Sequence, residues 1–231
     1  MMRQSAREEV RLRLLSTGLR VFAVHGYGGA TVREISEGSS TNIAAINYYF
    51  TDKRGFYCAV CEYARNLWRE SMAKTWEAAK VDPWKALRAQ IEVKLDATYD
   101  DKMFHVNWLF MRELMSENED IQLEGQDAEE RRKIYEGKMS ELLSRLLGEE
   151  AATLKNIKLL RYTLHSLCLF LPVQTTIENK YMKGKGYFNI KNTVDKKTLA
   201  DFIMTTIHQT VDEMRRQAKE APKGDGNGDS K

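Results

Sequence analysis

The segment Asn42–Gly55 has the sequence Asn-Ile-Ala-Ala-Ile-Asn-Tyr-Tyr-Phe-Thr-Asp-Lys-Arg-Gly, and the interpretation of the whole chain begins there. Asn42 is a favourable N-cap, because its side-chain oxygen can accept a free N–H of a first helical turn. Ile46 and Phe50 follow at a spacing of four and can share one buried face of a short helix. The opposite face carries small, amide and phenol side chains: Ala44, Ala45, Asn47 and Tyr48.

That second face is too polar for a core and too small and flat for an ordinary charged surface. Alanine methyl groups can contact thymine methyl groups, an asparagine amide can pair with adenine, and tyrosine and lysine can hold phosphates. The pattern predicts a recognition helix that lies in the major groove of DNA. Tyr48 and Tyr49 have a simpler alternative, which is aromatic packing at the end of the helix.

Two further helices are predicted before this one. Apolar residues at spacings of three and four predict a long helix over residues 6–25, with Gly26 as its C′ residue and a turn over residues 27–29. Thr31, followed by Glu34, has the capping-box pattern of a short second helix. Residues 38–41 then form a turn into Asn42. A short helix, a turn and a second short helix braced by a longer one make a helix-turn-helix.

These residues resemble the DNA-binding domain of TetR-family transcriptional regulators over about residues 7–64. The resemblance lies in Phe22, Gly26, Tyr27, Thr31, Val32 and Ile35, and then in residues 42–50 with Asp52 and Lys53. It implies DNA-facing positions on the recognition helix, phosphate contacts by Tyr49 and Lys53, and a phosphate contact by the Thr31 cap. The candidate DNA-binding residues are Thr31, Asn42, Ile43, Ala44, Ala45, Asn47, Tyr48, Tyr49 and Lys53.

The sequence and the family resemblance do not agree fully at one residue of the recognition helix and in the turn before it. Helical spacing groups Ile43 with the buried Ile46, whereas its family position places it on the DNA face. In the turn, the family commonly has alanines and a glycine, and this chain has Ser36, Gly38, Ser39 and Ser40.

The spacing of apolar residues indicates an all-α protein. Apolar residues mostly recur with a period near 3.6, and alternation with a period of two is nearly absent. The 231 residues are 42% hydrophobic and 30% charged, as in an ordinary soluble protein. The net charge of +3 lies entirely in residues 1–70, which hold 10 Lys and Arg against 7 Asp and Glu. Three cysteines, no signal-peptide pattern and no apolar run of about 20 residues predict a cytoplasmic protein.

The remainder of the chain is predicted to be a helical bundle. A long connecting helix follows Asp52 to about Lys80, Asp82-Pro83 starts another, and residues 103–115 form a helix that is apolar nearly all round. Gly148 ends a helix over residues 134–147, and Pro172 kinks or ends the next one. The apolar stripes of residues 151–171 and 196–215 predict a homodimer through a four-helix contact, which the resemblance also implies.

A region rich in methionine and aromatic residues is either plain helical core or an adaptable pocket for a small molecule, with Arg112 or His165 orienting a polar group. The resemblance favours a ligand site in this region. Cys58 and Cys61 lie on one predicted helix without a second cysteine pair, so helix packing is favoured over a zinc or redox site. The candidate ligand-binding residues are Trp68, Met72, Phe104, Trp108, Met111, Arg112, Met115, Tyr135, Met139, His165 and Cys168.

We therefore predict a helix-turn-helix domain over residues 1–55, a helical dimerisation and sensing domain over residues 56–220, and a disordered tail over residues 221–231. The predicted function is a homodimeric, ligand-responsive transcriptional repressor that binds a palindromic operator in double-stranded DNA. The effector is an unknown small molecule, with no metal or other cofactor and no membrane partner. The alternative is a DNA-binding regulator or activator without an effector, whose C-terminal half serves assembly alone. No catalytic constellation is present in the sequence, so an enzyme is not predicted.

Overall fold

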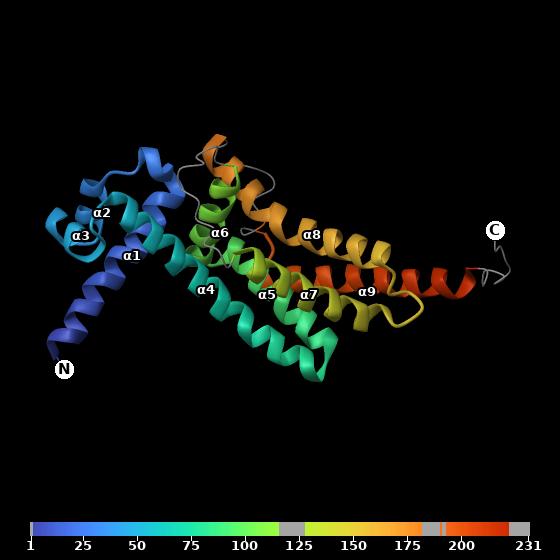
Figure 1. The fold of residues 1–231 in the computed structure, drawn as a ribbon. Coiled ribbons are helices and arrows are strands. Elements are labelled where there is room, and N and C mark those ends of the chain that lie inside the picture. The colour runs from blue at the N-terminus through green and yellow to red at the C-terminus, as the bar shows by residue number, and fades with distance from the viewer. Residues whose placement is uncertain (1, 116–127, 182–189, 191–192, 222–231) are drawn as a thin grey trace, which may run out of the picture.

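Helices make up the fold, and the all-α prediction is confirmed (Figure 1). The computed structural model describes residues 2–115, 128–181, 190 and 193–221, so the predicted disordered tail lies outside the described residues except for Ala221. The first three helices lie at one end of the molecule, α4 leads away from them, and α8 and α9 run side by side at the other end. The elements are α1 (Met2–Gly29), α2 (Val32–Gly38), α3 (Ile43–Phe50), α4 (Lys53–Val81), α5 (Pro83–Tyr99), α6 (Asp101–Leu114), α7 (Ala128–Leu147), α8 (Leu154–Tyr181) and α9 (Lys196–Glu220).

The predicted helix ends are largely confirmed. The side chains of Thr31, Asn42 and Asp82 cap α2, α3 and α5, each by accepting a backbone N–H of the first turn. Gly148 follows α7 with a φ of +76°, in the left-handed region that glycine favours. Pro172 does not end its helix, because α8 continues to Tyr181.

Gly26 divides α1 into two parts. Its φ of +69° and ψ of 177° break the helical path where the sequence predicts the end of the helix. Tyr27, Gly28 and Gly29 continue as a short helical turn instead of an open turn, and the N–H of Ala30 donates to the Gly26 carbonyl at 3.2 Å. The break redirects the chain into α2.

A first hydrophobic core holds the helix-turn-helix together. Phe22 of α1, Ile35 of α2, Ile46 of α3 and Phe56 of α4 are all fully buried in it. The same core includes Val106 and Leu109 of α6. The N-terminal helices are therefore packed directly against α6, which belongs to the predicted sensing domain.

The second hydrophobic core contains the two apolar stripes that were predicted to form the dimer contact. Leu160 and Leu164 of α8 and Ile203 and Ile207 of α9 are buried against α5 and α7 within one protomer. They do not form a surplus surface for a partner. A different set of large apolar side chains is exposed on α8 and α9: Leu154, Leu159, Tyr162, Phe170 and Phe202.

Helix α6 is not buried all round, contrary to the prediction for residues 103–115. Val106 and Leu109 are fully buried, but Met115 after the helix is 74% exposed. The helix is amphipathic because His105 and Arg112 interrupt its apolar positions. None of the described helices is both long and apolar enough to cross a membrane.

Candidate DNA-binding surface and effector site

Helix α3 is anchored on one side and exposed on the other. The side-chain oxygen of Asn42 accepts the N–H of Ala45 at 2.9 Å, while Ile46 and Phe50 are buried below the helix. Ile43 is 45% exposed, so it lies on the outer face as its family position implies and not with Ile46. Ala44, Asn47 and Tyr48 are also exposed, and Ala45 is half-buried at the edge of the core.

Residues beside α3 are held in place by aromatic contacts. The Lys53 ammonium lies 4.7 Å from the centroid of the Tyr27 ring, which positions a cation at the end of α3. Tyr49 is half-buried and contacts Tyr48 edge-on, with ring centroids 5.0 Å apart. Tyr48 itself is 67% exposed, so packing does not use most of its surface.

Serine side chains build the turn between α2 and α3. The buried Ser39 hydroxyl donates to the carbonyl of Ile35 at 2.8 Å and lies 2.9 Å from the Thr41 hydroxyl. Ser40 has a φ of +54°, the left-handed conformation that closes the turn. Thr31 is exposed at the start of α2, and Glu34 pairs with His25 at 3.2 Å.

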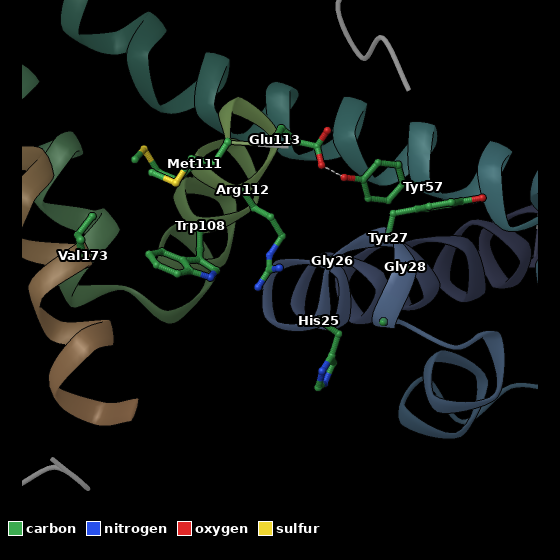
Figure 2. Close-up of a pocket in the computed structure, with 12 residues that line it drawn as sticks. His25, Gly26, Tyr27, Gly28, Tyr57, Trp108, Met111, Arg112, Glu113 and Val173 are labelled. Atoms are coloured by element: carbon green, nitrogen blue, oxygen red, sulfur yellow. Dashed lines mark hydrogen bonds between the residues drawn. The ribbon is translucent and has the colours of Figure 1, made fainter. Parts of the chain in front are cut away.

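Four of the predicted ligand-binding residues line a cavity of about 560 Å³ where α1 meets α6. They are Trp108, Met111, Arg112 and Met115. Figure 2 shows the cavity between the end of α1, helix α6 and Val173 of α8. The other lining residues are His25, Gly26, Tyr27, Gly28, Gly29, Tyr57, Glu113 and Val173.

Arg112 connects the two sides of this cavity. Its Nε donates to the carbonyl of Ala23 at 3.1 Å, and its Nη2 donates to the carbonyl of Val24 at 2.7 Å. Both carbonyls lie within three residues of the break in α1 at Gly26. In the structure Arg112 ties α6 to the end of α1, and its predicted contact with a ligand stays a prediction.

A second link joins α4 to α6 beside the cavity. The hydroxyl of the fully buried Tyr57 donates to the Glu113 carboxylate, as Figure 2 shows. Burial raises the pKa of Glu113 above its usual value. The Tyr57 ring also contacts Phe22 and Tyr27, with centroids 4.7 and 5.1 Å away. Side chains at this junction thus connect three helices.

Six of the other predicted ligand-binding residues lie elsewhere, among α4, α7 and α8. Met72, Met139 and Cys168 are almost completely buried, and Trp68 contacts the Tyr135 ring at 5.3 Å. His165 is partly buried on α8. The eleventh residue, Phe104, is stacked parallel to Trp108 with centroids 6.3 Å apart. The single site predicted from composition is therefore two groups of side chains.

Sequence reasoning missed the polar residues of this second group. Gln90, Lys94 and Thr98 of α5 are buried, and the Lys94 ammonium donates to the Tyr135 hydroxyl at 3.2 Å. The spacing of four between these residues could have identified them from the sequence. It puts three polar side chains on one face of a helix whose apolar residues are at positions 87, 91 and 95.

The cysteine pair on α4 is divided between core and surface. Cys61 is buried, and burial raises the pKa of its thiol to about 12, whereas Cys58 is exposed. A protonated, buried thiol is a packing residue. Among the described residues, no group of three or more His, Cys, Asp or Glu side chains is placed to hold a metal ion.

Comparison with known proteins identifies the family of the N-terminal region. Residues 14–60 match the family model described as bacterial regulatory proteins, tetR family. The HTH-type transcriptional regulator BetI of Paraburkholderia phytofirmans is 30% identical over 104 residues, which are 45% of this chain and 53% of BetI. The HTH-type transcriptional repressor AcnR of Corynebacterium glutamicum is 27% identical over 116 residues, 46% of this chain and 60% of AcnR. Residues 14–60 are therefore a TetR-family domain.

Both relatives are matched over less than two thirds of their length. Solved structures resemble the chain over much more of it. AibR in complex with isovaleryl coenzyme A and operator DNA matches 86% of this chain and 97% of its own, with a TM-score of 0.56 and 17% identity. A transcriptional regulator from Rhodococcus sp. Rha1 matches 87% and 95%, with a TM-score of 0.58 and 18% identity. At these identities the likeness confirms a TetR-type fold, an N-terminal helix-turn-helix followed by a helical bundle.

Proposed function

We propose that this TetR-family protein is a homodimeric transcriptional repressor that binds a palindromic operator through α3 and responds to a small molecule. The main observation that supports this proposal is the outer face of α3. It exposes Ile43, Ala44, Asn47 and Tyr48 on a capped helix whose other face is buried. That combination suits insertion into a major groove, because the buried face fixes the helix and the outer face is free for base edges.

Eight of the nine candidate DNA-binding residues are assigned separate contacts in this proposal, and Asn42 caps the helix. Asn47 supplies an amide for adenine, and Ile43 with the alanines supplies apolar contacts to thymine methyl groups. Tyr48, Tyr49, Lys53 and the Thr31 cap contact phosphates and fix the register of the helix on the duplex.

The dimer is proposed through the outer faces of α8 and α9, within residues 151–171 and 196–215. Leu159 is 46%, Tyr162 62%, Phe170 60% and Phe202 63% exposed, and such side chains are covered in most stable assemblies. A two-fold axis between these helices would present two copies of α3. Recognition helices about 34–36 Å apart can read successive major grooves.

Effector binding is proposed at the cavity between α1 and α6. A ligand there would lie against Arg112 and Tyr27, which belong to opposite sides of the junction. It favours release from the operator only if it binds the released conformation more tightly than the DNA-bound one. The solved structure of AibR contains isovaleryl coenzyme A and operator DNA in one complex, which supports small-molecule binding by a DNA-binding protein of this fold.

The first experiment is a selection of binding sites from a random double-stranded library, followed by fluorescence anisotropy on the selected operator. Tyr48→Ala and Lys53→Ala should each weaken binding at least tenfold, and Lys53→Ala should reduce the salt dependence by about one counterion. Lys80→Ala, an exposed lysine at the far end of α4, is the matched control. If both α3-side variants keep the affinity of the wild-type protein, the proposed surface is wrong.

A second experiment separates a ligand-responsive regulator from one whose C-terminal half only assembles it. Arg112→Met removes the link between α6 and α1. The responsive regulator should then show altered operator affinity with unchanged dimerisation in sedimentation. Unaltered operator affinity favours the alternative, a regulator without an effector.

A further inference from the structure

A second cavity lies where α1 and the end of α2 meet the start of α6, and its volume is about 300 Å³. We call it the polar cleft, and its lining includes Thr17 and Arg20 of α1, Gly38 of α2, and Asp101, Lys102 and His105 of α6. It shares no residue with the cavity at Arg112, and none of its residues is a candidate DNA-binding residue. The polar cleft is thus a separate junction between the helix-turn-helix and α6.

Two cationic side chains in the polar cleft have no carboxylate partner within the described part of the chain. Arg20 is exposed and forms no hydrogen bond or ion pair with another described residue. The Lys102 ammonium lies 5.6 Å from the centroid of the Tyr63 ring and likewise forms no ion pair there. By contrast, Arg11 of α1 and Arg33 of α2 each pair with a glutamate on their own helix. The cations of the cleft are therefore available to an anion.

Thr17 adds a buried hydroxyl to the same cleft. The residue is 8% exposed, and its hydroxyl has no hydrogen-bond partner among the described residues. A buried hydroxyl costs free energy unless it is hydrogen-bonded. Gly38 keeps the space beside it open, because a Cβ atom built there would lie 3.1 Å from the Thr17 methyl carbon and 3.7 Å from Nη2 of Arg20. A side chain at position 38 would therefore enter the space that Thr17 and Arg20 share.

His105 and Asp101 determine which kind of anion suits the cleft. Nδ1 of His105 lies 2.7 Å from the Asp101 carbonyl oxygen, and a carbonyl can only accept, so Nδ1 carries the proton. In the neutral ring Nε2 is then an acceptor. The Asp101 carboxylate is a second acceptor, and its Oδ2 lies 3.7 Å from Nδ1. An anion with an O–H group can donate to one of these acceptors while its other oxygens face the cations.

We propose that the polar cleft binds inorganic phosphate, which keeps at least one P–OH group at neutral pH. Arg20 and Lys102 pair with its charged oxygens, and the Thr17 hydroxyl donates to one of them. The P–OH group donates to His105 or Asp101. The bound anion holds α6 against α1 and the end of α2. The site goes beyond the proposed function, and only an effect of phosphate on operator affinity would rest on that function.

Isothermal titration of the full-length protein with sodium phosphate tests the site, without DNA and at an ionic strength kept constant with sodium chloride. Wild-type protein should bind one phosphate per chain. Arg20→Gln and Lys102→Gln should each weaken binding about tenfold, because each removes a hydrogen bond to a charged group. Lys74→Gln is the matched control, since it removes one charge from an exposed lysine of α4 outside the cleft, and it should bind phosphate as the wild-type protein does.

Thr17→Val tests the buried hydroxyl while keeping the shape of the side chain. It should weaken phosphate binding about fivefold without lowering the melting temperature in phosphate-free buffer, because the hydroxyl has no partner among the described residues. A lower melting temperature together with unchanged phosphate affinity would give the hydroxyl a structural role and overturn the proposal.

Sulfate distinguishes this site from a general attraction of anions to exposed cations. At the same ionic strength it should bind about tenfold more weakly than phosphate, because it has no proton to donate to His105 or Asp101. Equal affinities for the two anions, or equal losses in Arg20→Gln and Lys74→Gln, would overturn the proposal.

The phosphate groups of operator DNA are the other source of the same chemistry. If free phosphate does not bind and Arg20→Gln weakens operator binding in phosphate-free buffer, the cleft belongs to the DNA-binding surface and the proposal is wrong. Unchanged operator affinity of Arg20→Gln in that buffer, with phosphate binding lost, supports a site for the free anion. Because phosphate binding is measured without DNA, a failure of the regulator function would not affect this result.

Discussion

Gly55, in the first turn of α4, is the position where a single methyl group should disturb the DNA-binding unit most directly. A Cβ atom built on Gly55 would lie 2.3 Å from the carbonyl oxygen of Phe50, the last residue of α3. The contact involves backbone, which cannot rotate away as a long side chain can. Gly55→Ala therefore has to move the start of α4 away from the end of α3 by about 1 Å to reach ordinary van der Waals distance.

The free-energy change follows from two opposing effects. Alanine in a helix gains about 0.5–1 kcal/mol over glycine, because the unfolded chain loses freedom. Forcing a methyl group into a filled site costs about 1–3 kcal/mol, and the shift also strains the 2.7 Å bond from the Gly55 N–H to the Asp52 carboxylate. A net destabilisation of about 1–2 kcal/mol remains, which in a protein of this size lowers the melting temperature by about 2–8 °C.

The assay is thermal and urea unfolding at one protein concentration, together with operator affinity. Gly137→Ala is the control, since Gly137 is also helical and a Cβ there would meet nothing within 4 Å. It should stabilise by about 0.5–1 kcal/mol. Gly55→Ala should also weaken operator binding, because the end of α3 moves. Equal stabilisation by the two alanines would refute the argument that contact with Phe50 requires glycine.

Three further changes test other parts of the structure. Asn42→Ala should cost about 1 kcal/mol of stability and weaken operator binding, whereas Asn42→Ser, which keeps a capping oxygen, should retain most of both in urea unfolding and anisotropy. Arg112→Lys should lower stability by about 1–2 kcal/mol in urea unfolding, because one ammonium does not reproduce the guanidinium contacts to two carbonyls; unchanged stability would contradict that role. The depressed pKa of His165 predicts that stability falls between about pH 6.5 and pH 4, where the unfolded chain gains a proton that the folded chain does not; His165→Asn should remove about 1–2 kcal/mol of that fall in unfolding midpoints across this range.

Local features of the N-terminal region could be predicted from the sequence. Caps such as Thr31 and Asn42 depend on residues within four positions, and the spacing of Ile46 and Phe50 identifies the buried face of α3. Ile43 was the exception. Spacing alone left it between the two faces, and only the path of α3 over the core decides that it is exposed.

Contacts between distant segments could not be predicted in the same way. Periodicity shows which face of α8 and α9 is apolar, but the same stripe can be buried within one chain or against a second copy, and here it is buried within one chain. The partners of Arg112 are backbone carbonyls almost 90 residues away, next to the break at Gly26. The hydrogen bond from Lys94 to Tyr135 likewise joins residues 41 positions apart.

The types of side chain exposed on α3 affect how large a movement an effector would have to cause in order to weaken DNA binding. Apart from Asn47, its exposed side chains cannot form paired hydrogen bonds with a base. In the proposed dimer, affinity for one operator would then depend on phosphate register and on the distance between the two copies of α3. Arg112 and the Tyr57–Glu113 pair tie α6 to the helices that carry α3, so a displacement of α6 is transmitted to that distance. Under the proposed function, a ligand that moved α6 slightly would therefore be sufficient to release the operator, without any change in α3 itself.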